Sequence, residues 1–180
     1  MITQIDLSIL DFIQLHMKNA AFDVLAKVFD VLGKGGIVLI ALGILLLCFR
    51  QTRKLGFLIL VSLAIEALFC NVIIKPLVQR PRPWTITGVT PGAYPKDFSF
   101  PSGHTGATFA VVGALCGQRL AVVIPAWIFG ILMGFFRMYL YVHYPSDVLV
   151  GMLLGLISSV LARFLIQKVS QKLEERKQKV

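Results

Sequence analysis

The stretch Phe98-Ser99-Phe100-Pro101-Ser102-Gly103-His104-Thr105-Gly106 ends a polar loop and opens an apolar segment. The side chain of Ser102 is expected to cap a helix that begins here, and Gly103 lets the backbone approach a ligand closely. The free N–H groups of a first helical turn bind anions, and His104 adds a group that exchanges a proton near neutral pH. The stretch therefore predicts a helix that starts at an anion-binding site.

Two further groups of polar residues flank this stretch. Upstream lies Lys75, followed after six residues by Arg82-Pro83. Downstream lies Arg137, followed after five residues by His143 and after three more by Asp147. Cations, two histidines and a carboxylate together predict a phosphate site with groups for acid–base chemistry.

The composition indicates one integral membrane domain. Of the 180 residues, 57% are hydrophobic and only 15% are charged, and the mean hydropathy is +0.80. Soluble domains have about 25% charged residues. The formal net charge is +9, but a chain this apolar is not expected to bind nucleic acid. The three cysteines lie in apolar stretches without CxxC spacing, so neither a disulfide nor a zinc site is expected.

The hydropathy pattern predicts an all-α integral membrane bundle of five to six spans. Residues 1–34 are amphipathic and are expected to form one or two interfacial helices, or a sixth, partly polar crossing. Residues 35–167 are expected to form the transmembrane bundle, and residues 168–180 a charged, helical cytoplasmic tail. Small residues such as Gly151 and Gly155 predict close helix packing in the last span. The five expected spans are 35–49, 56–74, 105–117, 120–136 and 147–166.

Alternation of the spans puts all three polar groups on one side of the membrane. If the basic loop 50–54 faces the cytoplasm, loops 75–104 and 137–147 lie on the opposite face. Residues 118–119 and the tail, which has five cations against two acids, then lie inside, as the positive-inside rule requires. The site is therefore expected at the extracytoplasmic face of a multi-pass cell-membrane protein.

The residue types supply the parts of phosphoryl transfer, which needs positioning of the phosphate and neutralisation of its charge. Lys75, Arg82 and Arg137 are expected to bind the phosphate oxygens. Ser102 and the N–H group of Gly103 are expected to complete the phosphate site.

The spacing between His143 and Asp147 is typical of a histidine nucleophile and its orienting carboxylate. His143 and Asp147 are four positions apart across a helix start, so they can share one face. A carboxylate at one ring nitrogen leaves the other nitrogen unprotonated and more basic. A buried structural pair is the alternative, which the cations on the same membrane face disfavour. His104, on another segment, is expected to protonate the leaving oxygen and then to activate water.

Some of the polar residues have an alternative interpretation. Arg80 and Lys96 are interpreted as interfacial residues that snorkel to the membrane surface. His104, His143 and Asp147 could together bind a metal ion. Three nearby cations would oppose a divalent ion, so no metal and no other cofactor is expected.

Taken in order, ten of these positions resemble the signature of the type 2 phosphatidic acid phosphatase (PAP2) family, relatives of the vanadium haloperoxidases. The matching residues are Lys75-x6-Arg82-Pro83, Pro101-Ser102-Gly103-His104 and Arg137-x5-His143-x3-Asp147. One position departs from the pattern, because Phe136 stands where the family usually has serine. This departure removes one hydrogen bond to phosphate or to a neighbouring group.

The resemblance implies a helical bundle that hydrolyses phosphate esters without a metal, through a phosphohistidine. It implies His143 as nucleophile, Asp147 as its orienting group and His104 as general acid. The residues that it implies for phosphate binding are Lys75, Arg82, Ser102, Gly103 and Arg137. Short bacterial members include undecaprenyl diphosphate phosphatases and phosphatidylglycerophosphate phosphatases, and an outward-facing site suits the first.

The predicted function is hydrolysis of a lipid phosphate or diphosphate, with undecaprenyl diphosphate as the favoured substrate. A phosphatidylglycerophosphate or phosphatidic acid phosphatase and a lipid phosphotransferase are alternatives. A phospholipid-binding or transport protein without catalysis is an alternative of another class. The expected partners are the lipid substrate and the bilayer, and no oligomeric state is predicted. Glu66 in the second span is expected to face the bundle interior in a hydrogen-bonded, structural role.

Overall fold

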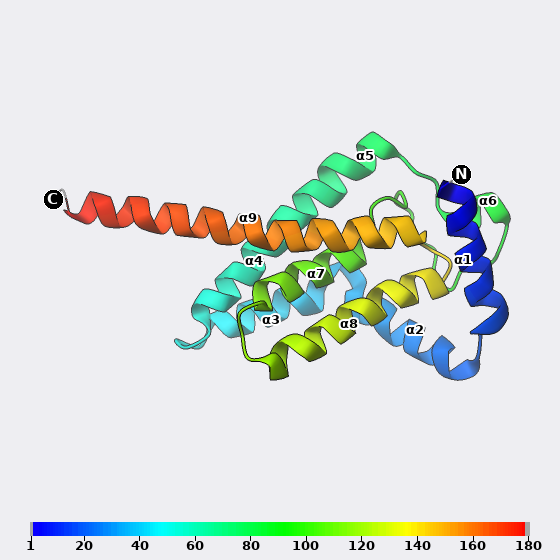
Figure 1. Cartoon of the computed structure of the whole chain (residues 1–180), viewed down its shortest axis with the longest axis horizontal. Coiled ribbons are helices and arrows are strands. Elements are labelled where there is room, and N and C mark those ends of the chain that lie inside the picture. The colour runs from blue at the N-terminus through cyan, green and yellow to red at the C-terminus, as the bar shows by residue number, and fades with distance from the viewer. Residues whose placement is uncertain (1, 179–180) are drawn as a thin grey trace.

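The computed structural model describes residues 2–178 and the side chains of residues 3–176. This part of the chain consists of helices and loops and contains no strand, as predicted (Figure 1). Residues 1 and 179–180, which belong to the predicted N-terminal segment and tail, lie outside the described residues. The helices are α1 (Ile2–His16), α2 (Ala20–Gly33), α3 (Ile37–Leu47), α4 (Arg53–Ala67), α5 (Lys75–Val78), α6 (Pro83–Thr87), α7 (Gly103–Leu115), α8 (Leu120–Tyr139) and α9 (Pro145–Gln178), with a 3₁₀ turn (Lys34–Gly36) before α3 and a π-helical segment (Leu68–Ile74) before α5.

Four helical stretches are long and apolar enough to cross a membrane. They are Ala20–Leu47, Arg53–Thr87, Leu120–Tyr139 and Pro145–Arg176. They overlap four of the five predicted spans, and they support the predicted multi-pass membrane protein. The remaining predicted span corresponds to α7, which has 13 residues. The total of five to six spans therefore stays a prediction.

Several helix boundaries differ from the predicted ones. The chain bends at Gly35 and Gly36, whose φ angles of 60° and 67° suit glycine, and α3 begins only at Ile37. Helix α8 continues to Tyr139, so Arg137 lies in its last turn rather than in a loop. Helix α9 runs without a break to residue 178, so the tail is a helical extension that projects beyond the bundle (Figure 1).

Helix α7 is the centre of the bundle. It packs against α4, α8 and α9, and ten of its 13 residues are buried. A Cβ atom on Gly151 of α9 would lie 2.6 Å from the carbonyl oxygen of Ser102, and one on Gly155 would overlap the main chain of Gly106. Glycine at both positions therefore lets α9 lie directly against the start of α7, as the small residues predicted.

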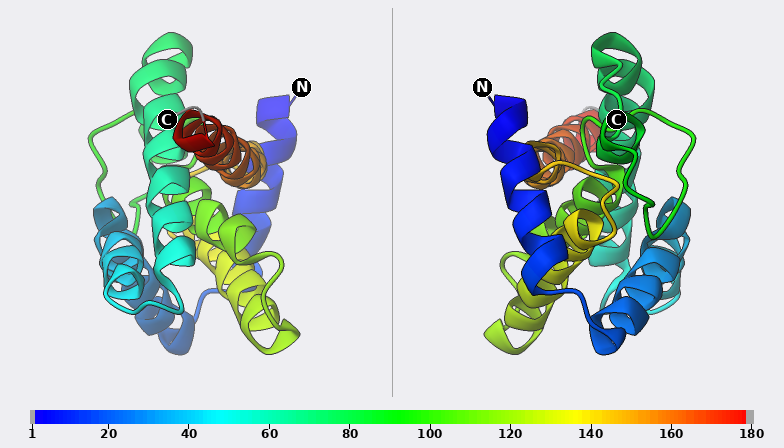
Figure 2. Two further views of the ribbon diagram at one scale, coloured as in Figure 1. Left: turned by 90° about the vertical axis from the view of Figure 1, so that its left-hand side faces the viewer. Right: turned by 90° about the vertical axis from the view of Figure 1, so that its right-hand side faces the viewer.

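The two N-terminal helices cover one end and one side of this bundle. Helix α1 crosses the junction of α8 and α9, and α2 packs on α8 (Figure 1). Seen along the long axis, α1 lies on one side of α9, and α4 and α5 lie on the other (Figure 2). Asp6, Leu10 and Ile13 of α1 are buried against the bundle, whereas its opposite face exposes Ile5, Ile9, Phe12 and Leu15. Helix α1 therefore exposes an apolar face and buries one acidic residue, Asp6, on its inner face.

Candidate active site

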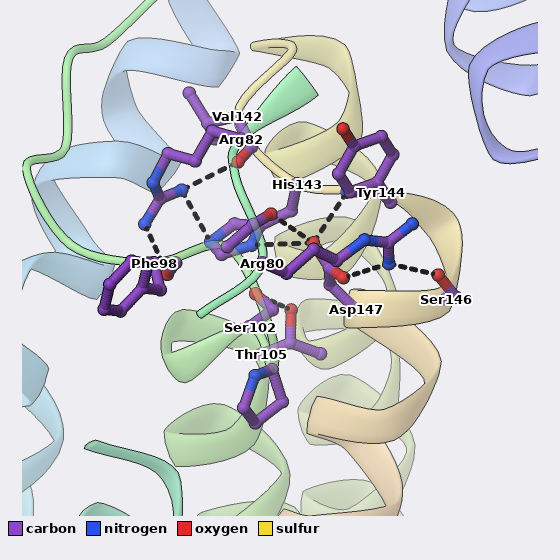
Figure 3. Close-up of polar contacts among 12 residues, drawn as sticks. Arg80, Arg82, Phe98, Ser102, Thr105, Val142, His143, Tyr144, Ser146 and Asp147 are labelled. Atoms are coloured by element: carbon purple, nitrogen blue, oxygen red, sulfur yellow. Dashed lines mark hydrogen bonds and ion pairs between the residues drawn. The ribbon is translucent and has the colours of Figure 1, made fainter. Parts of the chain in front are cut away.

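His143 lies in the turn between α8 and α9, and Asp147 lies in the first turn of α9. The Nδ1 atom of His143 is 3.5 Å from the Oδ2 atom of Asp147 (Figure 3). Both side chains are buried, with exposed fractions of 2% and 0%. The carboxylate thus faces one edge of the imidazole, and the Nε2 edge is directed away from it.

Three further donors hold the Asp147 carboxylate. The N–H group of Tyr144 donates to Oδ2 at 3.0 Å, and the hydroxyl of Ser99 donates to the same oxygen. Arg80 donates from Nη1 to Oδ1 at 2.6 Å (Figure 3). The carboxylate is therefore fixed in the orientation that faces His143.

Arg82 approaches the free edge of the same imidazole. Its Nη1 atom is 3.3 Å from Nε2 of His143 (Figure 3). The guanidinium is 4% exposed, and it donates to the carbonyl oxygens of Val142 at 2.7 Å and of Asp97 at 2.8 Å. A buried cation beside Nε2 can hold an anion where that nitrogen would attack it.

Lys75 and Arg82 share a carboxylate that was not among the predicted site residues. Lys75, the first residue of α5, forms an ion pair with Oδ2 of Asp97. Arg82 donates from Nη2 to Oδ1 of Asp97 at 2.7 Å. The Asp97 side chain is 51% exposed, while those of Lys75 and Arg82 are 8% and 4% exposed. An acidic group of the protein therefore bridges two cations that were predicted to bind phosphate.

The start of α7 is tied to the start of α9. The N–H group of Ser102 donates to the carbonyl oxygen of Asp147 at 3.1 Å. Ser102 precedes the helix, but its hydroxyl lies 3.0 Å from the hydroxyl of Thr105 (Figure 3). It makes no capping bond to a main-chain N–H group. The prediction that the Ser102 side chain caps α7 is therefore wrong, because Thr105 takes its hydroxyl.

His104 borders a cavity of about 260 Å³. Its Nε2 atom is buried and has no hydrogen-bond partner among the described residues. A Cβ atom on Gly33, at the end of α2, would overlap the His104 ring, so α2 confines that ring from one side. The polar residues that line the same cavity beside His104 are Glu66, Asn71, Lys75 and Asp97, and Gly103 is one of the glycines that border it.

Arg137 presents an unused edge of its guanidinium. Its Nη1 atom pairs with Oδ1 of Asp30 on α2 at 2.8 Å. Its Nε and Nη2 atoms are buried without a hydrogen-bond partner in the described part of the chain. Two parallel donors on one edge match two oxygens of a phosphate or carboxylate.

Both site histidines are neutral in the free protein at neutral pH. Burial lowers the pKa of His143 to about 4, and the charge of Arg82 adds to this effect while Asp147 opposes it. Burial and then the charge of Arg137 lower the pKa of His104 to about 3. A neutral His143 keeps a lone pair at the edge that faces Arg82.

Comparison with known proteins shows the family of this chain. The family model described as PAP2 superfamily matches residues 55–171, more than half of the chain. The chain belongs to the PAP2 superfamily. The match contains all three groups of polar residues.

Several PAP2 relatives are similar over most of this chain. Undecaprenyl-diphosphatase of Sulfolobus acidocaldarius is 34% identical over 119 residues, which cover 62% of this chain and 55% of that protein. Phosphatidylglycerophosphatase B of Bacillus subtilis is 29% identical over 153 residues, which cover 79% of this chain and 70% of that protein. The crystal structure of Aquifex aeolicus LpxE has a TM-score of 0.77 and 29% identity, over 87% of this chain and 93% of that chain. The chain thus spans about half the length of the first of these relatives.

Phe136, the position that departs from the PAP2 pattern, belongs to the hydrophobic core. It is 2% exposed, and its ring centroid lies 4.8 Å from that of Phe29 and 6.1 Å from that of Phe22. Both partners are on α2. Phe136 therefore packs α2 onto α8 next to the pair of Asp30 and Arg137.

The interpretation of Arg80 as a snorkelling residue is wrong. Besides Asp147, it binds Asp6 of α1, with 2.7 Å between Nη2 and Oδ2, and its guanidinium lies 3.7 Å from the centre of the Tyr144 ring. The Arg80 side chain points into the PAP2 site because it forms ion pairs there with the carboxylates of Asp6 and Asp147. In the sequence, only its position two residues before Arg82 could have indicated that Arg80 belongs to the site.

The acidic partners Asp6, Asp30 and Asp97 were not among the predicted site residues. Asp6 accepts hydrogen bonds from both the N–H group and the hydroxyl of Ser146 as well as from Arg80. In the sequence, Asp30 is one of several charges spaced along an amphipathic helix. No spacing rule connects Asp6 or Asp30 with a residue more than 70 positions away.

Glu66 faces the bundle interior, as expected, and lines the cavity beside His104. It is 3% exposed, and a Cβ atom on Gly106 would overlap its carboxylate. Its Oε1 atom has no hydrogen-bond partner among residues 3–176. The expected hydrogen-bonded role is therefore not seen at this oxygen.

Proposed function

We propose that this PAP2 protein hydrolyses the terminal phosphate of a membrane lipid through a phosphohistidine on His143. The observation that carries the proposal is the placement of the imidazole between Asp147 at Nδ1 and Arg82 near Nε2. A neutral ring with its lone pair beside a buried cation has the properties of a nucleophile toward phosphorus.

In the first step, Nε2 of His143 attacks phosphorus, and the bond from phosphorus to the lipid oxygen breaks. Asp147 stabilises the positive charge that develops on the ring. Lys75, Arg82 and the free edge of Arg137 neutralise the phosphate oxygens, together with Ser102 and the N–H group of Gly103.

His104 is proposed to handle the protons. The negative charge of the bound phosphate favours the protonated ring, which then donates to the leaving lipid oxygen. In the second step, neutral His104 removes a proton from water as the water oxygen attacks phosphorus. The bond from phosphorus to Nε2 breaks, and inorganic phosphate leaves. No step requires a metal ion or another cofactor.

The favoured substrate is undecaprenyl diphosphate. The relative from Sulfolobus acidocaldarius bears the name of that activity, and a polyprenyl chain suits a site at the end of apolar helices. A phosphatidylglycerophosphate phosphatase is the second candidate, because the Bacillus subtilis relative with that name matches a larger share of this chain.

The proposed topology places the site at the extracytoplasmic membrane face. The turn 48–52, residues 116–119 and the far end of α9 lie at the end of the bundle away from the site, which supports this orientation (Figure 1). Residues 1–34 are proposed to be interfacial, residues 35–167 to form the bundle in five to six spans, and residues 168–180 to form a cytoplasmic tail. The exposed apolar face of α1 supports the interfacial placement.

Phosphate release by the detergent-solubilised protein tests the function. Undecaprenyl diphosphate, phosphatidylglycerophosphate and phosphatidic acid are assayed side by side with EDTA present. We expect turnover of at least one lipid, highest for undecaprenyl diphosphate, and loss of turnover in His143→Gln. Retained activity in His143→Gln overturns the nucleophile, and inhibition by EDTA overturns the metal-free route. Labelled phosphate that appears in another lipid instead of water identifies a phosphotransferase, and lipid binding without release identifies a binding protein.

A further inference from the structure

Lys75 and Arg82, two of the cations proposed to bind phosphate, are already paired within the chain. Asp97 accepts from Arg82 with one carboxylate oxygen and pairs with Lys75 through the other. Its two oxygens therefore occupy the positions that two phosphate oxygens would take on the same side chains.

The Asp97 carboxylate is ionised throughout the neutral range. Its partial burial opposes ionisation, but the hydrogen bond and charge of Lys75, followed by those of Arg82, hold its pKa at about 2. A full negative charge thus lies in the proposed phosphate site before any ligand arrives.

The Asp97 side chain has room to rotate away from Lys75 and Arg82. Its side chain is 51% exposed, and Asp97 borders two cavities, the 260 Å³ cavity of His104 and a second one of about 490 Å³ lined by Arg80, Trp84 and Tyr94. Space to accept a rotated side chain therefore lies on both sides of it.

Arg82 does not depend on the carboxylate for its own position. Its Nε and Nη1 atoms donate to the main-chain carbonyl oxygens of Asp97 and Val142 at 2.8 and 2.7 Å. These bonds remain when the Asp97 side chain turns away. The carboxylate is therefore a ligand of Arg82 and not the support that orients it.

We propose that Asp97 is a specificity-determining residue, an internal anion that an incoming phosphate must displace from Lys75 and Arg82. The inference rests on the proposed phosphate site. A terminal phosphate carries up to two negative charges and three free oxygens, so it competes well with one carboxylate. A phosphodiester, such as the linkage in ordinary membrane phospholipids, carries one charge and two free oxygens and competes poorly. Asp97 thereby keeps the site clear of the bulk lipids and admits terminal phosphates.

Calorimetric titration of the full-length protein in detergent tests this without turnover. The probes are inorganic phosphate and dimethyl phosphate, a permanent monoanion, at neutral pH. In Asp97→Asn and Asp97→Ala, inorganic phosphate is expected to bind about tenfold more tightly than in the wild type. The reason is that phosphate no longer has to break a charge-assisted hydrogen bond between Asp97 and the cations. Dimethyl phosphate is expected to gain measurable binding in the same variants.

Two controls separate the charge of Asp97 from other effects. Asp97→Glu keeps the charge and is expected to bind phosphate as the wild type does. Glu174→Gln removes a carboxylate from the exposed end of α9 and is also expected to match the wild type. Unchanged or weaker phosphate binding in both neutral variants overturns the proposal, as does wild-type protein that binds both probes equally. Because binding needs no hydrolysis, these results are independent of whether the lipid assay supports the proposed function.

Discussion

Arg80 donates to one oxygen of Asp147 across 2.6 Å, while the other oxygen of that carboxylate faces the imidazole of His143. Arg80 also pairs with Asp6, so the N-terminal helix α1 is connected to the site through two ion pairs in series. A positioning network of this kind acts on the proposed nucleophile without touching the substrate.

Replacement of Arg80 tests this network. We expect Arg80→Gln to lower kcat by about ten- to hundredfold with little change in KM, because a hydrogen bond between charged groups is lost away from the phosphate. Steady-state kinetics on the preferred lipid measure the two constants. Arg80→Lys should recover part of kcat, and Lys96→Gln, on the exposed loop, should stay within about twofold of the wild type. Wild-type kcat in Arg80→Gln would refute a positioning role.

Replacement of Gly33 by alanine tests whether activity depends on the position of the His104 ring. The backbone of Gly33 is helical, with φ of −85°, so alanine fits the main chain, but its Cβ atom would overlap the imidazole. We expect Gly33→Ala to reduce turnover about tenfold because the ring is pushed aside. The melting temperature should change by only a few degrees, since the cost of the overlap is partly offset by the preference of alanine over glycine for helix, about 1 kcal/mol. Full activity in this variant would mean that the ring position is not critical.

Replacement of Asp30 by asparagine tests whether the ion pair with Asp30 orients the guanidinium of Arg137. Removal of its charge in Asp30→Asn frees the guanidinium from its ion pair, so the fork that is proposed to hold phosphate loses its fixed direction. We expect KM to rise about tenfold with a smaller effect on kcat. Asp23→Asn is the matched control on the same helix, because Asp23 accepts a hydrogen bond from the hydroxyl of Tyr139 and pairs with no cation among residues 3–176. Equal effects of the two substitutions would show that only the packing of α2 matters.

The low histidine pKa values predict how stability depends on pH. The pKa values of His104 and His143 are about 3 and 4 in the folded protein and about 6.5 in an unfolded chain. Between pH 6.5 and 4 the unfolded chain therefore binds protons that the folded protein does not, and stability falls as the pH is lowered. We expect the melting temperature in detergent to fall over this range in the wild type. The fall should be smaller in the double variant with glutamine at both positions, and an equal fall in both proteins would contradict the assigned values.

The all-helical fold and the assignment of the three groups of polar residues to one site could be predicted because both depend on local sequence patterns. Hydropathy marks the apolar helices, and the spacing of His143 and Asp147 fits a helix start. The small residues Gly151 and Gly155 indicated close packing in α9, although not that α7 would be the partner.

The residues that support the site could not be predicted in the same way. The pairs of Arg80 with Asp6 and of Arg137 with Asp30 depend on how α1 and α2 fold back over α8 and α9. That arrangement is set by tertiary packing, including the contact of Phe136 with Phe29. The placement of Asp97 on two cations likewise depends on the path of an irregular loop, for which no periodicity exists.

The central claim, that Nε2 of His143 forms a covalent bond to phosphorus, is tested most directly by trapping the intermediate. The wild-type protein is mixed with lipid carrying radiolabelled terminal phosphate and quenched within the first turnover in alkaline denaturant, followed by proteolysis and mass spectrometry. We expect label on the peptide that contains His143, and no label in His143→Gln. Label on another residue, or turnover in His143→Gln without any labelled protein, would contradict it.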